Sequence, residues 1–162
     1  MTAQIKQANF TNNLFDLLDE TFENQNQNSA YLDRGTSLYE TLATINASEA
    51  SRPVSATCAT LAAQVAHVNF YLETLERYIL KQDSGKIDWG EIWRTVKEVT
   101  PDEWAALQQQ LRTTYQRIVA MLRQLETWDD EDTIGGALAI VVHTAYHLGE
   151  IRQALCTLKQ SA

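Results

Sequence analysis

Apolar residues recur at helical spacing in four long segments of the chain. Residues three and four positions apart share one face of an α-helix, so this recurrence predicts amphipathic helices. We expect them at about residues 7–23, 55–80, 100–128 and 133–158. The segment 55–80 is the clearest, because it contains no glycine or proline. Its apolar stripe consists of Leu61, Val65, Val68, Leu72, Leu75 and Ile79.

A polar stretch separates the first long segment from a shorter one. Residues 24–29, five Asn and Gln residues followed by Ser, are poor helix formers without an apolar anchor. Ser37 and Glu40 then have the spacing of a capping box, which predicts a helix start. Pro53 ends this region. The pattern leaves open whether the second helix continues the first after a kink or stands alone.

A long connection precedes the third long helix. Residues 81–99 are mostly polar, and a connection of this length, with room for a short helix, often is functional or covers something. Thr100, Pro101 and Glu103 predict the next helix start, because Thr caps, Pro fits the first helical position and Glu completes a capping box. We interpret the acidic run 129–132 as a solvated turn that favours the N-terminus of the last helix, rather than as a cation site.

These segments predict an all-α fold. We expect a four-helix bundle with a short extra helix or a long connection between its helices, formed by a single domain over residues 1–162. The chain has 13 Lys and Arg against 21 Asp and Glu, a formal net charge of −8. This charge opposes attraction to phosphate backbones and to anionic lipids, so we expect no nucleic-acid or membrane partner.

The apolar runs of the sequence also predict the cellular compartment of the protein. The first ten residues lack the apolar core of a signal peptide, and the longest apolar run, residues 137–142, is far too short to span a bilayer. We therefore expect a cytoplasmic protein. Cys58 and Cys156 are isolated cysteines in helical patterns, and we interpret both as small buried hydrophobic residues rather than as a disulfide framework.

The three histidines fall in two of the long helices. His143 and His147 are four residues apart, so their imidazoles point the same way one turn apart, as two ligands of one metal ion do. His67 lies in the middle of the segment 55–80. Ligation by histidine alone favours Zn, Ni or Fe over Ca or Mg. The alternative is a metal-free bundle with three hydrogen-bonded core histidines.

Residues near the histidines exclude one class of metal site and supply two weak catalytic candidates. A zinc-protease motif has Glu directly after its first His, where this chain has Thr144. Glu150, three residues beyond His147, is a weak catalytic candidate that can act as a carboxylate ligand, a base or a partner orienting a ligand, although such a residue is more often a solvated boundary residue. Tyr71, one turn beyond His67, is the other weak candidate, and an aromatic residue at helical spacing more often belongs to the core.

The histidine pattern resembles a known family. A histidine in the middle of the second long helix, here His67, followed by His-x-x-x-His-x-Gly in the last helix, here residues 143–149, is similar to the DinB/YfiT-like superfamily of metal-binding four-helix bundles. Trp89 and Trp93, followed by residues 100–104, resemble that family's connection into its third helix. The resemblance covers essentially the whole chain. It implies a divalent-metal site at the three histidines, with open positions commonly filled by water, and often a homodimer.

The resemblance also implies a function. Characterised relatives are metal-dependent transferases that use low-molecular-weight thiols, a thiol-dependent isomerase and metal-dependent hydrolases. We therefore expect an enzyme that activates a thiol or water against a small electrophilic substrate. The alternative is a non-catalytic structural or interaction module in which the metal holds helix segments together. An open coordination position distinguishes the first possibility from the second. The family name derives from induction by DNA damage and implies no DNA binding.

Overall fold

The computed structural model describes residues 5–27, 29–83 and 85–160. The described residues are all-α, as predicted, and their only β feature is an isolated bridge between Pro53 and Thr60. The helices are α1 (Gln7–Phe22), α2 (Leu38–Leu42), α3 (Ala47–Ala50), α4 (Leu61–Ile79), α5 (Glu91–Thr95), α6 (Pro101–Arg123) and α7 (Glu131–Gln160).

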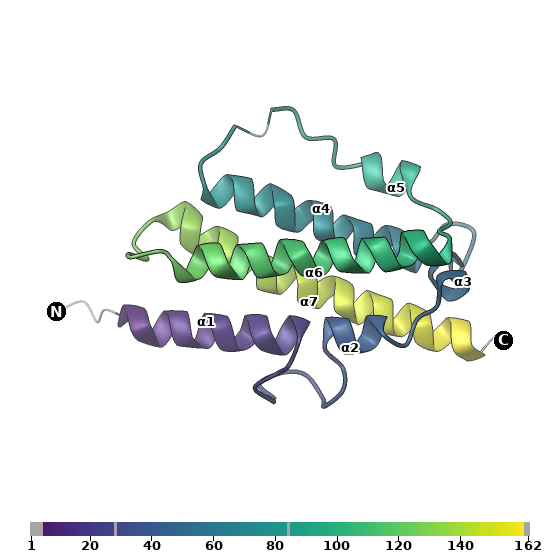
Figure 1. The fold of residues 1–162 in the computed structure, drawn as a ribbon, viewed down its shortest axis with the longest axis horizontal. Helices are drawn as coiled ribbons and strands as arrows, with labels where there is room; N and C mark the ends of the chain where they lie inside the picture. The colour runs from purple at the N-terminus through teal and green to yellow at the C-terminus, as the bar shows by residue number, and fades with distance from the viewer. Residues whose placement is uncertain (1–4, 28, 84, 161–162) are drawn as a thin grey trace.

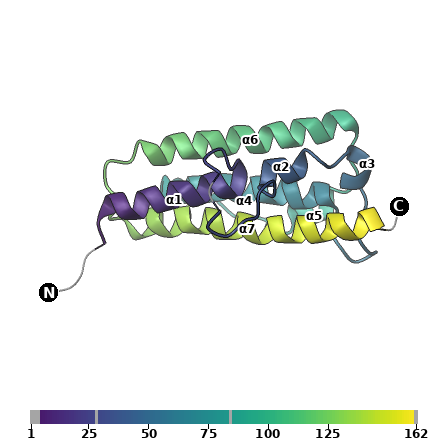
Figure 2. The same ribbon diagram turned by 90° about the horizontal axis from the view of Figure 1, so that it is seen from below.

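The four long helices α1, α4, α6 and α7 lie side by side, and the short α2 follows α1 in nearly the same line (Figure 1, Figure 2). α4 packs against both α6 and α7, and α1 packs against α7. Phe22 of α1 stacks on Tyr115 of α6 with ring centroids 4.1 Å apart, which joins α1 to α6. α4 and α7 are thus in direct contact along the part of the molecule that carries the histidines.

α1 and α2 are separate helices, which resolves the question that the sequence left open. Asn24 and Gln27 adopt positive φ angles of 53° and 52°, a left-handed conformation that no continuing helix contains. The predicted break also includes Asn28, which lies outside the described residues. The turn is held by the buried Glu20 carboxylate, which accepts backbone N–H groups including that of Leu32 at 2.7 Å. Polar residues therefore form an ordered connection here.

α4 begins at Leu61 rather than near residue 55. Thr60 caps this start, because its Oγ1 accepts the backbone N–H of Ala63 at 3.1 Å. The later start corrects the interpretation of Cys58, which lies in the irregular segment before α4 and is exposed. Cys156 does lie in a helix, but it too is exposed, because α7 turns its neighbour Leu155 toward the core instead. The prediction that both cysteines are buried is wrong.

α6 begins where its capping signal predicts. The backbone N–H of Thr100 donates to the Glu103 carboxylate at 2.7 Å, and the Glu103 N–H donates to Thr100 Oγ1 at 3.3 Å. The helix ends at Arg123, earlier than the predicted residue 128. Trp128 is nevertheless buried, because beyond the helix it packs against Phe10 of α1 with ring centroids 5.5 Å apart. Trp128 therefore belongs to the core, as its apolar spacing indicates, but it lies beyond the end of the helix.

The acidic run 129–132 lies across the start of α7 and has the predicted role there. Asp130 accepts the backbone N–H of Thr133 at 2.9 Å and lies 2.6 Å from the ammonium of Lys81. α7 itself is long and apolar enough to cross a membrane by length and composition, although core helices of water-soluble proteins meet the same criterion. In this structure it packs against α1 and α4.

Candidate metal centre

The packing of α4 against α7 brings the three histidines together. His67 comes from α4, and His143 and His147 come from successive turns of α7. One nitrogen of each imidazole lies within 4.8 Å of the other two. The ring of His67 has its centroid 5.1 Å from that of His143 and 4.8 Å from that of His147. The predicted grouping of the three side chains is therefore present.

The free nitrogens of the cluster are buried. His67 and His147 are 8% and 5% exposed, and His143 is half-buried. His67 Nδ1 and His143 Nε2 are inaccessible to solvent and have no hydrogen-bond partner among the described residues. A buried polar atom left without a partner costs about 1–3 kcal/mol. A metal ion that accepted both lone pairs would remove this cost, so the orphaned atoms fit a metal ligand set.

The third histidine is held from its other side. His147 Nδ1 lies 2.6 Å from Gln64 Oε1 and 2.9 Å from Glu150 Oε2. Both neighbours are acceptors, so Nδ1 carries the proton and Nε2 keeps its lone pair. An imidazole that binds a metal is commonly fixed in this way by an oxygen acceptor on its second nitrogen.

The protonation states agree with this arrangement. Burial, with a smaller contribution from the neighbouring His147, lowers the pKa of His67 to about 4 and that of His143 to about 3. Burial also lowers the pKa of His147, although Glu150 opposes the shift. All three imidazoles are therefore neutral at pH 7, and their lone pairs are available without loss of a proton.

The donor set and its size suit a transition metal. Neutral imidazoles prefer Zn, Ni, Cu or Fe to the hard cations Ca and Mg. Two nitrogens bound to one tetrahedral zinc ion are about 3.4 Å apart, given the usual Zn–N bond length. The three histidine nitrogens lie within 4.8 Å of one another, so the rings would move toward one another to bind a single ion. Among the described residues, no Cys, Asp or Glu joins the three histidines as a fourth ligand.

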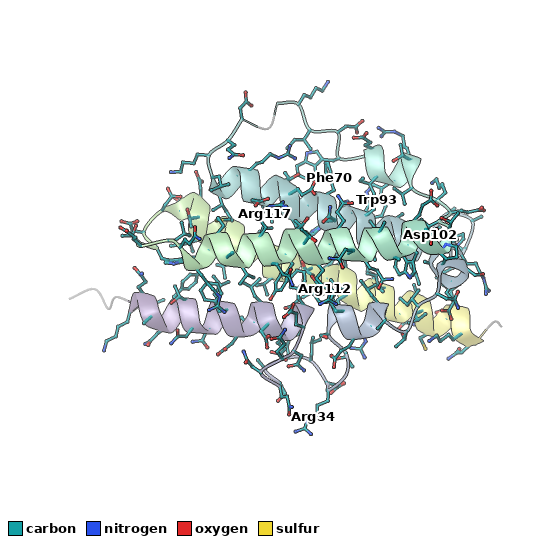
Figure 3. The ribbon with its side chains drawn as sticks, viewed as in Figure 1. Arg34, Phe70, Trp93, Asp102, Arg112 and Arg117 are labelled. Carbon is teal, nitrogen blue, oxygen red and sulfur yellow. The ribbon has the colours of Figure 1, made fainter. Side chains whose placement is uncertain are left out.

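Aromatic side chains cover the cluster. Trp93 of α5 lies over His67 with ring centroids 4.3 Å apart, and Figure 3 shows this residue where α5 approaches α4. Trp89, in the same connection, packs on Tyr71 at 5.7 Å. The prediction that residues 81–99 cover something is confirmed, since this connection places aromatic rings against the histidine site.

The two weak catalytic candidates both touch the cluster. The ring of Tyr71 stacks on His143 with centroids 3.5 Å apart and planes 15° apart, so it contacts the site as a packing surface. The carboxylate of Glu150 contacts the proton-bearing side of His147, the position of a partner that orients a ligand. A hydrogen bond to this carboxylate also raises the pKa of Tyr146.

Gln64 is the site residue that the sequence analysis missed. It lies one turn before His67 on α4, but its bond crosses to His147, which is 83 residues away in the chain. Gln64 and Glu150 also line a cleft of about 570 Å³ on the outer side of His147. Only the spacing of Gln64 from His67 could have drawn attention to it, because no sequence motif pairs a glutamine with a histidine on another helix.

No family model, curated protein or solved structure matches this chain. The geometry of the histidine cluster is therefore the main evidence on function.

Proposed function

We propose that the protein is a four-helix bundle of the DinB/YfiT-like type that binds a divalent metal ion, Zn, Ni or Fe, through His67, His143 and His147. The observation that carries the proposal is the convergence of three neutral imidazoles, two of which have buried nitrogens without a partner among the described residues. Such an arrangement costs free energy in the absence of a ligand, whereas the alternative of three core histidines predicts hydrogen-bonded rings.

We further propose that the centre is catalytic. With His67, His143 and His147 as its ligands, a bound ion would keep a position open for an exogenous ligand and, as a Lewis acid, would lower the pKa of a thiol or water bound there toward neutrality. Gln64 and Glu150 hold His147 in one tautomer and orientation. Trp93 and Tyr71 exclude bulk water from two of the rings. These features support a thiol transferase or hydrolase acting on a small electrophile, with a low-molecular-weight thiol as cosubstrate.

We also propose a substrate class, an oligomeric state and a cellular compartment for this activity. The substrate is a small molecule, the protein is a cytoplasmic homodimer, and neither nucleic acid nor membrane is a partner. The net charge of −8 supports the absence of polyanionic partners. Leu138, Val142 and Tyr146 are exposed at four-residue spacing along α7, and this apolar stripe supports association of two copies.

The first experiment is metal analysis of untagged protein. We expect about one equivalent of Zn, Ni or Fe, which is lost in His67→Ala. Asn69→Ala is the matched control, because Asn69 is also a buried polar residue of α4 but is not a ligand. Retention of metal by His67→Ala at wild-type affinity contradicts the three-histidine site.

The second experiment tests catalysis on the metal-loaded protein. Common cellular thiols are combined with model electrophiles, and hydrolytic substrates are tested in parallel. Turnover that disappears in His143→Ala supports an enzyme. Stoichiometric metal without turnover on any thiol or hydrolytic substrate favours the structural module instead.

A further inference from the structure

We propose that the chain has a second ligand site, a pocket for a compact oxyanion such as a phosphate or carboxylate group, on the face of α7 away from the histidines. The pocket has a volume of about 250 Å³ and lies between the segment around α2 and the last turns of α7. Cys156, in its wall, is nine residues beyond His147, which places the two about 180° apart around the helix. Its lining consists of Gly35, Thr36, Thr41, Thr44, Arg152, Leu155, Cys156 and Lys159.

The charge of this lining is positive. Arg152 and Lys159 are seven residues apart, two turns of one helix, and so share a face. Among the residues that the structure describes, neither forms a salt bridge, and the Lys159 ammonium reaches across the pocket to donate to the carbonyl of Thr44 at 3.4 Å. Among the described residues, no carboxylate lines the pocket. Two cations without a counter-charge around one hollow, in a chain of net charge −8, are the arrangement that attracts an anion.

The opposite wall is lined by threonine hydroxyls that are hydrogen-bonded within the α2 region, and these side chains carry no charge. The hydroxyl of Thr44 donates to the carbonyl of Thr41 at 2.8 Å, and that of Thr36 donates to the carbonyl of Asp33 at 2.5 Å. Because these protons are engaged, recognition of an anion falls to the two cations, and the guanidinium of Arg152 can hold two oxygens at once.

Two other charged side chains of the α2 region are directed elsewhere. The Glu40 carboxylate accepts the backbone N–H of Ser37 at 3.0 Å and its hydroxyl at 2.6 Å, so it is occupied at the start of α2. Arg34 extends away from the helices in Figure 3. The pocket is also smaller than the roughly 300–1,000 Å³ of sites that enclose drug-sized ligands, so it suits one oxyanionic group rather than a whole nucleotide.

The two cysteines make the proposal testable in the native chain. Both are exposed, but Cys156 lines the oxyanion pocket whereas Cys58 lines the separate cleft beside Gln64. The rate of alkylation of each thiol by iodoacetamide, a neutral reagent, is measured by mass spectrometry of peptides while inorganic phosphate replaces sodium chloride at constant ionic strength. We expect phosphate to protect Cys156 with a saturable dependence and to leave Cys58 unchanged. At ten times the dissociation constant the alkylation of Cys156 slows about tenfold.

Two variants distinguish binding of phosphate in the pocket from a general effect of the protein's charge on the alkylation rate. Arg152→Gln should abolish the protection, whereas Lys86→Gln, which removes the same charge from an exposed position, should retain it. Acetate in place of phosphate distinguishes a carboxylate ligand from a phosphate ligand. Equal protection of both cysteines, or none of Cys156 in folded wild-type protein, overturns the proposal. The cations then only complement the C-terminal end of α7. Because no histidine lines the pocket, His67→Ala protein should give the wild-type result.

Discussion

Two polar clusters join α4 to α7, and they differ in whether their polar atoms are satisfied. Near the start of α7, Asp130 accepts bonds from Lys81 and Thr133, and the Tyr78 hydroxyl donates to Asp132 at 2.6 Å. In the middle of α7, the three histidines, 67, 143 and 147, are more deeply buried, yet two of their nitrogens lack a partner among the described residues.

The difference separates a structural cluster from a ligand site. An exposed, fully paired cluster gives a helix its start and costs little, because water and the partners share the charges. A buried cluster with orphaned lone pairs is unfavourable unless something binds there. Changes at the histidine cluster should therefore have large effects, and changes at the exposed cluster small ones.

Metal should stabilise the protein only through the histidine cluster. At a free metal concentration one thousand times the dissociation constant, binding to the native state adds about 4 kcal/mol to the free energy of unfolding. Denaturant titrations with and without Zn should show this gain in the wild type and in Asp130→Asn, and should show none in His143→Ala. An equal gain in His143→Ala contradicts the assignment.

The metal-free protein should be destabilised by mild acid through the same cluster. The pKa values of His67 and His143 are lowered from about 6.5 to about 4 and about 3, so below pH 6.5 the unfolded chain takes up protons that the native state does not. The free energy of unfolding is therefore highest above pH 6.5 and falls with decreasing pH, by at most about 1.4 kcal/mol per pH unit for each histidine.

The exposed cluster around Asp130, near the start of α7, should change the free energy of unfolding in a different pH range. Hydrogen bonds from Lys81 and Thr133 lower the pKa of Asp130 from 3.8 to about 2. Its contribution is thus fully present above pH 4 and is lost as the pH falls toward 2. Denaturant titrations of His143→Asn and Asp130→Asn across pH 2–8 separate the two effects. A loss between pH 6.5 and 4 that His143→Asn leaves unchanged excludes this histidine as its cause.

Replacing Gln64 should lower the metal affinity less than replacing a ligating histidine, but more than replacing an exposed residue nearby. Removing the oxygen that fixes a ligating histidine typically costs 10–100-fold in metal affinity, so Gln64→Ala should weaken metal binding by roughly that factor. Gln153→Ala is the matched control, because Gln153 lines the same cleft but does not form the hydrogen bond that joins Gln64 to His147. Competition with a chelator of known affinity gives both values, and equal affinities indicate that Glu150 alone holds the ring.

The smallest loss of stability is expected from a substitution in the exposed cluster around Asp130. Lys81→Gln removes the salt bridge to Asp130, whose groups are exposed and screened by solvent. We expect a melting temperature near that of the wild type and unchanged metal affinity. A large loss of stability in this variant would show that the exposed cluster contributes more than its accessibility suggests.

Periodicity and capping chemistry predicted much of the fold, because they act over neighbouring residues. The start of α6 follows from Thr100 and Glu103, which bond within one turn. Periodicity failed where an apolar residue served the core from outside a helix, as at Trp128, and where residues with a helical pattern formed a loop, as at Cys58. A hydrophobic pattern records burial or its absence, and does not by itself distinguish a helix from the turn that follows it.

The helical spacing of His143 and His147 was enough to place them on one face, because residues four apart on a helix point the same way. The contacts of His67 with them, of Gln64 with His147 and of Trp93 with His67 could be learned only from the folded chain. These contacts depend on the register in which α4 packs against α7 and on the path of the connection after α4. Both follow from the packing of the whole core rather than from any local spacing.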